Sequence, residues 1–374
     1  MDDMSLYEQV AEKLNSLSTD SYSMGLGFDG YVDEIIAAVD SRDSAESFKN
    51  IPSITQLGNR ILAAAGKSTN IELVTNQWKL GGNGPILGNS IAHLGIRVDY
   101  IGALGYPEVH KVFSACHKDF KYISIDQPGH TMALEFEDGK IMLGRFAMKD
   151  MDWNCLEKHV KEAHLKQFFY GHNMLGMVNW TQTPHMSAIW DKLLSGFLSQ
   201  CSKPSERPFL FVDVADPQKR SKQDIQHMLD QLSRFESFYR VILGLNEKES
   251  TEIAKALEIP YSTETPEKLQ QLALEISKRL RIYGCVVHPV KYAVCALGNN
   301  TFYHEGPYIA NPLISTGAGD HFNAGFCFGQ ILGLTPEESL MTGVANSGFY
   351  VRTAKSATKK ELIQFIHDWK NKKI

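Results

Sequence analysis

Apolar residues along this chain occur either at helical intervals or in short continuous runs, a pattern that predicts helices packed on a buried sheet. Residues 5–17 carry apolar side chains on one helical stripe, and the apolar run at 23–28 predicts the first strand. Helical segments lie between most of the later runs, which favours an α/β fold with a doubly wound, mostly parallel sheet flanked by helices. Further buried strands are predicted at residues 98–101, 168–170, 209–214, 241–245, 285–287 and 294–297.

A second pattern in the first half of the chain predicts a small additional sheet. Residues 131–136 and 141–144 flank an Asp-Gly turn, which predicts a β-hairpin. Upstream, the looser region from Glu34 to Lys79 contains a predicted helix at 54–65 and an alternating segment at 71–75. We interpret the hairpin as part of a small sheet that projects from the main one and serves as a lid.

The composition is that of an ordinary globular protein. The chain has 374 residues, of which 43% are hydrophobic and 22% charged, and this size predicts one large domain with an insertion, or two domains. The formal net charge of -5 gives no support to binding of nucleic acid or an acidic membrane surface. No apolar run is long enough to span a membrane, and the acidic N-terminus lacks the core of a signal peptide.

The cysteines predict a cytoplasmic protein with reduced thiols. None of them forms a Cys-x-x-Cys pair, and most occur among apolar residues, where buried free thiols are common. The six are Cys116, Cys155, Cys201, Cys285, Cys295 and Cys327.

The stretch Gly317-Ala-Gly-Asp320 is the strongest candidate for chemistry. Three small residues precede an apolar helical pattern, so free backbone N–H groups and the helix dipole can converge on an anion such as phosphate. Asp320 would itself repel a phosphate, and its presence needs a separate explanation. It is either a base that takes the proton of an attacking hydroxyl, or a residue that caps the helix.

Two acids and a glycine turn add candidates for ligand binding. Asp29 and Asp33 follow the first strand, at the sheet edge where open α/β folds bind ligands, although Asp29 is equally suited to a turn. The sequence Gly81-Gly-Asn-Gly84 predicts a tight turn into a helix, which allows the backbone to approach a ligand closely.

Two further glycine motifs do not meet the requirements of nucleotide-binding loops. Ala65-Gly-Lys-Ser-Thr69 resembles the end of a P-loop, but Ile61 stands where its first glycine is needed. Gly82-Asn-Gly84 begins a dinucleotide fingerprint, but Leu87 occupies the third glycine position.

The sequence Asn246-Glu-Lys-Glu249 follows a predicted strand and has two interpretations. By itself it is typical of a helix N-cap with acids in the first turn. An acid one helical turn after an Asn can also hold metal-bound water. The segment Asp216-Pro-Gln-Lys-Arg220 similarly predicts a turn after the strand at 209–214.

Taken together in this order and spacing, these motifs resemble the ribokinase-like (PfkB) carbohydrate kinase family over nearly the whole chain. The resemblance implies a single catalytic domain, residues 1–374, in which segments of about 30–80 and 127–147 form a small β-sheet lid. It implies transfer of the γ-phosphate of ATP to a hydroxyl of a small carbohydrate, with Mg²⁺ and a monovalent cation such as K⁺. It also implies a homodimer formed through the lid.

The resemblance also assigns roles by position. It implies that Asp320 is the catalytic base, with Gly317, Ala318 and Gly319 as the anion hole. The implied substrate-binding residues are Asp33, Asp29, Gly81, Gly82, Asn83 and Glu135; Asn246 and His288 would bind the nucleotide, and Glu249 the metal.

Three departures from the family pattern keep alternatives open. Ile86 stands where the family usually has an Asn that contacts substrate, and His288-Pro-Val290 replaces a nucleotide-side Thr-x-Gly segment. His321, after the candidate base, is larger than the usual small residue and is either a packing residue or a tuner of Asp320. The alternatives are a nucleoside kinase of the same fold and a catalytically silent sugar or nucleotide sensor.

Overall fold

The computed structural model describes residues 5–145, 147–200 and 206–374, whose body is built on a nine-stranded sheet. The strand order is β14-β13-β12-β11-β10-β9-β1-β5-β6. All neighbours from β6 to β12 are parallel, and β13 and β14 are antiparallel additions at one edge, which confirms the predicted fold class. The strands are β1 (Ser23–Phe28), β5 (Arg97–Gly102), β6 (Phe120–Ser124), β9 (Met174–Met177), β10 (Phe209–Asp213), β11 (Arg240–Leu245), β12 (Gly284–Val287), β13 (Tyr292–Leu297) and β14 (Asn300–Glu305).

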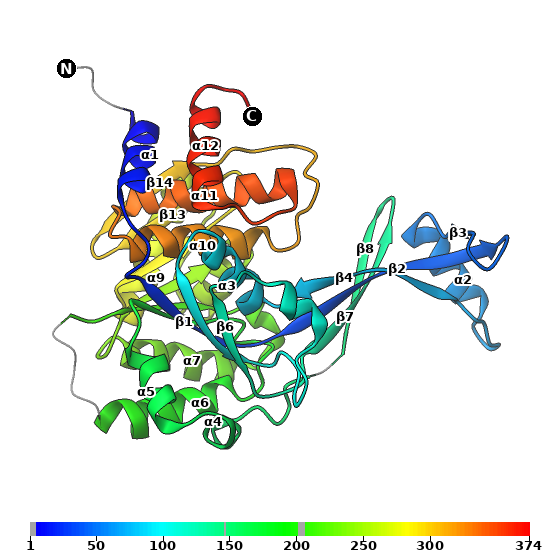
Figure 1. Cartoon of the computed structure of the whole chain (residues 1–374), viewed down its shortest axis with the longest axis horizontal. Coiled ribbons are helices and arrows are strands. Elements are labelled where there is room, and N and C mark those ends of the chain that lie inside the picture. The colour runs from blue at the N-terminus through cyan, green and yellow to red at the C-terminus, as the bar shows by residue number, and fades with distance from the viewer. Residues whose placement is uncertain (1–4, 146, 201–205) are drawn as a thin grey trace.

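Helices cover both faces of this sheet (Figure 1). Their apolar side chains form two separate cores with those of the strands. On one face lie α1 (Leu6–Ser16), α3 (Asn83–His93), α10 (Ala318–Ile331), α11 (Pro336–Thr353) and α12 (Lys359–Lys370). On the other lie α4 (Trp153–His159), α5 (Glu162–Tyr170), α6 (Met186–Lys192), α7 (Lys222–Phe235), α8 (Glu247–Ala256) and α9 (Pro266–Leu280). None of the helices in the described ranges combines the length and apolar character that crossing a membrane would require.

One predicted strand is wrong. Residues 168–170 form the last turn of α5, and the strand at this point of the sheet is β9, Met174–Met177. The error has a physical reason, because Leu165, Phe168 and Phe169 are buried at the i, i+3, i+4 spacing of one helix face.

The cysteines agree with the prediction of free thiols as far as they are described. Cys285, Cys295 and Cys327 are buried, whereas Cys116 and Cys155 are partly exposed. Cys201 lies outside the described residues.

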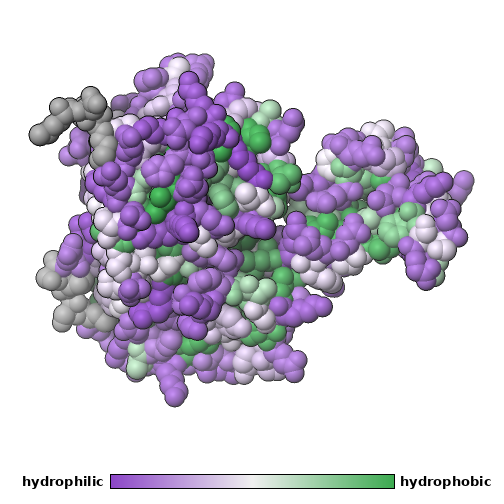
Figure 2. All heavy atoms as spheres, turned by 45° about the horizontal axis from the view of Figure 1, so that its top comes forward, coloured by the Kyte–Doolittle hydropathy of each residue, from purple (hydrophilic) through white to green (hydrophobic). Residues whose placement is uncertain are grey.

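A second sheet projects from the body and forms a separate lobe (Figures 1 and 2). Its long central strand β2 (Tyr31–Arg42) pairs with β4 (Leu73–Gly81) on one side and with β7 (Gly129–Phe136) on the other. The predicted hairpin is confirmed, since β7 and β8 (Gly139–Arg145) are antiparallel. The short β3 (Phe48–Asn50) pairs with the far end of β2.

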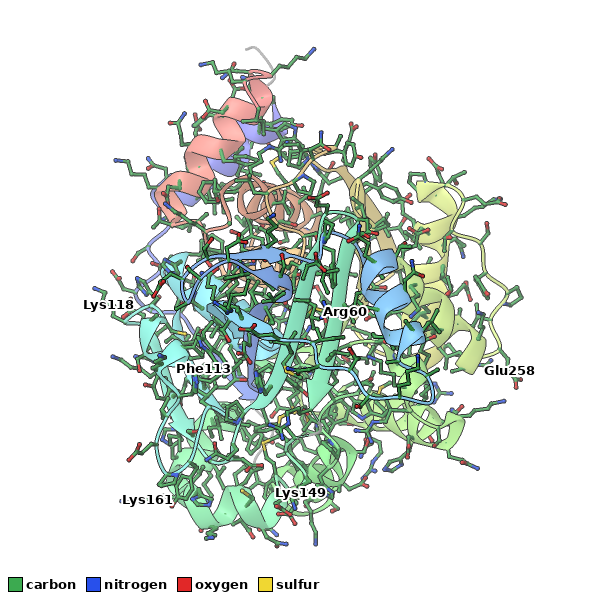
Figure 3. The ribbon with its side chains drawn as sticks, turned by 90° about the vertical axis from the view of Figure 1, so that its right-hand side faces the viewer. Arg60, Phe113, Lys118, Lys149, Lys161 and Glu258 are labelled. Carbon is green, nitrogen blue, oxygen red and sulfur yellow. The ribbon has the colours of Figure 1, made fainter. Side chains whose placement is uncertain are left out.

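Helix α2 (Ile54–Ala63) packs on this second sheet around a small apolar core of its own. Leu57 of the helix contacts a cluster that includes Ala38 and Leu134 from the strands. Figure 3 looks onto this end of the molecule and labels Arg60 of α2, which donates to the Val39 carbonyl at 3.2 Å. The predicted segment at 71–75 overlaps the start of the longer strand β4, which begins at Leu73 and ends at the glycine turn.

Helices α10 and α11 pack closely because glycines face their contact. A Cβ atom at Gly325 would overlap the Thr342 carbonyl oxygen and lie 2.8 Å from the Cβ atom of Asn346. Asn346 in turn donates to Ser90 at 3.0 Å and to the His321 carbonyl at 2.6 Å. This packing fixes the start of α10 relative to α3, and both helices lead into the site described below.

We predict that Gly325→Ala lowers the free energy of unfolding by about 1–3 kcal/mol, the usual range for overpacking, despite the helix preference of alanine. Urea unfolding followed by circular dichroism measures this. Gly58→Ala in α2 is the matched control, because a Cβ atom there meets nothing within 4 Å, and it should cause no loss. Equal unfolding free energies for the Gly325 variant and the wild type would contradict the prediction.

Candidate active site

Two helix N-termini meet at the candidate catalytic acid. Helix α10 begins at Ala318 after Gly317, whose φ of 88° requires glycine, and Asp320 lies in its first turn with only 8% of its surface exposed. Helix α3 begins at Asn83 after Gly82, whose φ is 89°. The Asn83 amide donates to Asp320 Oδ1 at 3.0 Å, so the carboxylate is held across the gap between the two helices.

Asp29 lies beneath the glycine turn and is fully buried. Its Oδ1 accepts from the backbone N–H of Gly84 at 2.9 Å, and its Oδ2 accepts from Asn179 at 2.8 Å. Burial raises the pKa of Asp29 to about 6 against the opposing effect of these donors. The structure therefore makes Asp29 a support for the start of α3.

Asp33 faces the space between the second sheet and the body. It pairs with Lys79 across β2 and β4, and a Cβ atom at Gly81 would lie 2.6 Å from its Oδ1. Burial raises the pKa of Asp33 to about 6, and the nearby Lys79 charge partly offsets this. Glycine at position 81 is thus needed for the carboxylate to lie against the turn.

A cavity of about 830 Å³ separates the second sheet from the body. The polar residues on its walls suit a ligand that carries several hydroxyl groups. Ile86 contributes an apolar wall from α3, at the position where the resemblance leads one to expect a polar contact. Other residues that line the cavity are Asp33, Lys79, Glu135, Lys140, Thr316, His321 and Tyr350.

A smaller cavity of about 390 Å³ lies on the other side of the loop that leads into α10. Pro312 and Ser315 line both cavities, so the two spaces adjoin at the Gly317 turn. The walls of the smaller one are mostly apolar, as a nucleobase site requires, and Asn246, Ala318 and Gly319 also line it.

His288 lies in this smaller cavity as a neutral side chain. Its ring packs against Phe322 at 4.7 Å between centroids, and burial lowers its pKa to about 4. A Cβ atom at Gly319 would lie 3.2 Å from the His288 ring, so the two residues are close neighbours.

Asn246 forms the helix N-cap that the sequence alone suggested, and with Glu249 it completes a capping box. The Asn246 side chain accepts from the Glu249 N–H at 2.9 Å, and Glu249 Oε2 accepts from the Asn246 N–H at the same distance. Glu249 Oε1 also accepts from the Asp216 N–H at 2.9 Å. Burial raises the pKa of Glu249. Each of its two carboxylate oxygens can still accept one more hydrogen bond.

Asp213, the last residue of β10, also belongs to this site, although its sequence motif did not predict it. Its carboxylate accepts from Asn323 at 2.8 Å and from the Ala215 N–H at 3.0 Å. Burial, and then repulsion by Glu249, raises the pKa of Asp213 to about 8. The available signal was an acid at the end of a buried strand, the same signal that identified Asp29.

These acids act on one another. Burial, and then repulsion by Asp213 and Asp29, raises the pKa of Asp320 well above its ordinary value. A group with such a pKa binds a proton readily, which is the property needed in a base.

His321 serves as a packing residue that shapes the turn before Asp320. Its Nδ1 lies 2.8 Å from the Gly317 carbonyl, its Nε2 lies 3.0 Å from Ser356 Oγ, and its ring stacks on Tyr350 at 3.6 Å. A carbonyl only accepts, so Nδ1 carries the hydrogen and Nε2 accepts from Ser356. Burial lowers the pKa of His321 to about 4, so the imidazole is neutral.

No three His, Cys, Asp or Glu side chains in the described ranges stand ready as a metal site. A Mg²⁺ ion held here by one or two carboxylates would take the rest of its coordination from water and a bound ligand, as is common for this ion.

Comparisons with known proteins identify the family of this chain. The family model for prokaryotic ketohexokinase matches residues 7–369. The ketohexokinase of Haloferax volcanii is 28% identical over 345 residues, which cover 91% of this chain and 89% of the relative.

Solved structures share the fold at low identity. The ribokinase of Thermotoga maritima superimposes with a TM-score of 0.61 at 14% identity, covering 92% of this chain and 99% of that one. A phosphofructokinase-2 variant from Escherichia coli gives a TM-score of 0.63 at 14% identity, covering 94% and 99%. With a family model that spans nearly its whole length, the chain belongs to the prokaryotic ketohexokinase family, and it is a carbohydrate kinase with a ribokinase-like fold.

Proposed function

We propose that this protein transfers the γ-phosphate of ATP to a hydroxyl group of a ketohexose. The observation that carries the proposal is the meeting of a polar cavity and a mostly apolar cavity at the N-terminus of α10, beside the buried carboxylate of Asp320. The name of the Haloferax volcanii relative supports a ketohexose as the acceptor.

In this mechanism Asp320 accepts the proton of the attacking hydroxyl. Its raised pKa favours proton uptake, and the hydrogen bond from Asn83 keeps its carboxylate oriented. The backbone N–H groups of Gly317 and Gly319 would bind the oxygens of the phosphoryl group, helped by the positive end of the α10 dipole. The Ala318 N–H donates to the Ser315 carbonyl at 3.1 Å and would have to leave it to join them.

The sugar would lie in the larger cavity. Asp33 and Glu135 from the second sheet, with the Gly81-Gly-Asn83 turn, would accept or donate hydrogen bonds to its hydroxyl groups. The second sheet forms one wall of this cavity, and we propose that it acts as the lid that keeps water from the reaction. A homodimer formed through this lid remains a prediction.

The nucleotide would lie in the smaller cavity, where Asn246 and His288 contribute to the walls. The carboxylates of Asp213, Glu249 and Asp320 suit Mg²⁺, because each has spare oxygen lone pairs. Burial raises the pKa of each one, and a cation would balance the negative charge that burial disfavours. Glu249 and Asp213 would hold the ion through its water molecules, and Mg²⁺ would neutralise charge on the donor phosphates. Activation by a monovalent cation such as K⁺ remains a prediction.

The two alternatives are less well supported. Membership of the ketohexokinase family favours a sugar over a nucleoside as the acceptor. A silent sensor has no need of a base, yet Asp320 is oriented and has a raised pKa.

A panel of acceptors and donors tests the proposed function directly. We expect phosphorylation of a ketohexose with ATP and Mg²⁺, with aldohexoses and nucleosides at least about 10-fold poorer in kcat/KM, since a built hydrogen-bonding site discriminates strongly. Phosphorus NMR of the products identifies the phosphorylated hydroxyl. Phosphorylation of nucleosides alone, or ligand binding without any phosphorylated product, would overturn the proposal.

We predict that Asp320→Asn lowers kcat by about 10²–10⁴, the range for loss of a positioned base. The amide has nearly the same shape, so the unfolding midpoint should remain within a few degrees of that of the wild type. Asp230→Asn on the exposed surface of α7 is the matched control and should retain full activity. Near-normal turnover in the Asp320 variant would disprove its role as base.

We also predict that Asp213→Asn moves the acid limb of the kcat/KM profile to lower pH. Asp320 must be ionised to act, so activity is lost as the pH falls through its pKa. Asp213 and Asp320 repel each other, so the two carboxylates are ionised together only at a raised pH. With Asn at position 213 this repulsion is absent, and the limb should shift down by roughly 1 pH unit. The quantity measured is the pH at the midpoint of the acid limb, not the maximal kcat/KM. An unchanged or raised midpoint would contradict the role of Asp320 as base.

A further inference from the structure

The hairpin of the second sheet places a lysine against the loop that precedes the anion hole. Lys140, the second residue of β8, donates from Nζ to Thr316 Oγ1 at 3.3 Å. Thr316 directly precedes Gly317, and its carbonyl accepts from the Tyr350 hydroxyl at 2.9 Å. The lysine thus joins two parts of the molecule that are 176 residues apart in sequence.

The hairpin that carries Lys140 is held in position at its tip. The Asp138 carboxylate accepts from the Ile54 N–H at 2.9 Å, and the Glu137 N–H donates to the Pro52 carbonyl at the same distance. Both contacts tie the hairpin to the start of α2. Lys140 therefore extends from a fixed element, while its own long side chain remains free to reorient.

Lys140 also faces an acid across the hairpin. Glu135 lies opposite it in the register of β7 and β8, and the two charged groups are 3.8 Å apart. The lysine side chain is 38% exposed, so this pair contributes little stability and can be broken when another anion arrives.

The charges around the proposed anion hole indicate a role for Lys140. The carboxylates of Asp29, Asp213, Glu249 and Asp320 repel one another there, and no Lys or Arg lines the smaller cavity within the described ranges. Lysines 79, 140 and 355 line the larger cavity. Of these, Lys140 is the one with a hydrogen bond to the loop that leads into the anion hole.

We propose that Lys140 is a catalytic residue, which the second sheet supplies to the phosphoryl group during its transfer. This inference rests on the proposed kinase function. The ammonium group leaves Thr316 Oγ1 and contacts an oxygen of the phosphoryl group above the Gly317–Gly319 amides. Transfer then requires the second sheet to lie close to the body, so that lid position and chemistry are coupled.

Two other roles would leave different signatures. If Lys140 only holds the second sheet to the body, its replacement would lower the unfolding midpoint and the sugar affinity. It would not slow the chemical step selectively. If Lys140 only binds the sugar, its replacement would raise KM for the sugar with little effect on kcat.

Kinetics of Lys140→Met and Lys140→Arg, with Lys49→Met as the control, distinguish these roles. Lys49 is an exposed lysine of β3 in the same lobe, and its replacement should leave the kinetics unchanged. For Lys140→Met we expect kcat to fall by about 10²–10³, as for loss of one group that stabilises transition-state charge. The sugar dissociation constant from calorimetry should change less than about 3-fold, and Lys140→Arg should restore part of kcat because it keeps the charge.

Binding of a transition-state mimic provides the second measurement. The affinity of the enzyme with sugar for ADP, Mg²⁺ and aluminium fluoride should fall by a similar factor in Lys140→Met, while affinity for ADP and Mg²⁺ alone is retained. A kcat within twofold of the wild type, or a loss confined to KM for the sugar, would overturn the inference. If the wild type phosphorylates no ketohexose, the proposed function fails instead, and the Lys140 variants are then assayed with whichever acceptor the panel identifies.

Discussion

The burial of several carboxylates in one place is the constraint on which the rest of this site depends. Asp213, Glu249 and Asp320 come from three separate elements and Asp29 from the loop after β1, yet burial raises the pKa of each one. Removing an unpaired charge from water is costly. The fold supports these acids with N–H donors rather than with lysine or arginine, so their negative charge stays available to a bound cation or to a proton in transit.

Those donors explain why α3 and α10 begin where they do. The first two residues of α3 serve two different acids, since Asn83 donates to Asp320 and Gly84 donates to Asp29. Asn323, one turn further along α10 than Asp320, donates to Asp213 at the end of β10. The start of α3 thus orients the Asp320 carboxylate. Asn323 in turn links α10, which carries Asp320, to the end of β10. A change in the conformation of the glycine turn would therefore displace the donors to both Asp320 and Asp29.

The sequence predicted the elements whose information is local, and it failed where partners come from afar. The main sheet, the hairpin and the motif at Asp320 follow from apolar spacing, turn chemistry and a helix start rich in small residues. The strand predicted at 168–170 was wrong because a short apolar run fits a buried helix face equally well. Asp213 and Asn179 were missed because their importance depends on Asn323 and Asp29, which lie more than 100 residues away along the chain.

The two histidines beside the proposed anion hole are neutral, so neither supplies positive charge there. Burial lowers the pKa values of His288 and His321 to about 4, so neither ring contributes charge near Asp320 at neutral pH. His321 instead donates to the Gly317 carbonyl and stacks on Tyr350, which fixes the turn geometrically. In the part of the chain that the structure describes, the smaller cavity has no Lys or Arg in its walls, and Lys355 is the lysine that the body contributes to the larger one. Under the proposed mechanism, positive charge near Asp320 would come from the metal that accompanies the donor and from lysines of the larger cavity, Lys140 of the second sheet among them. Transfer would then follow binding of both substrates, with the second sheet against the body.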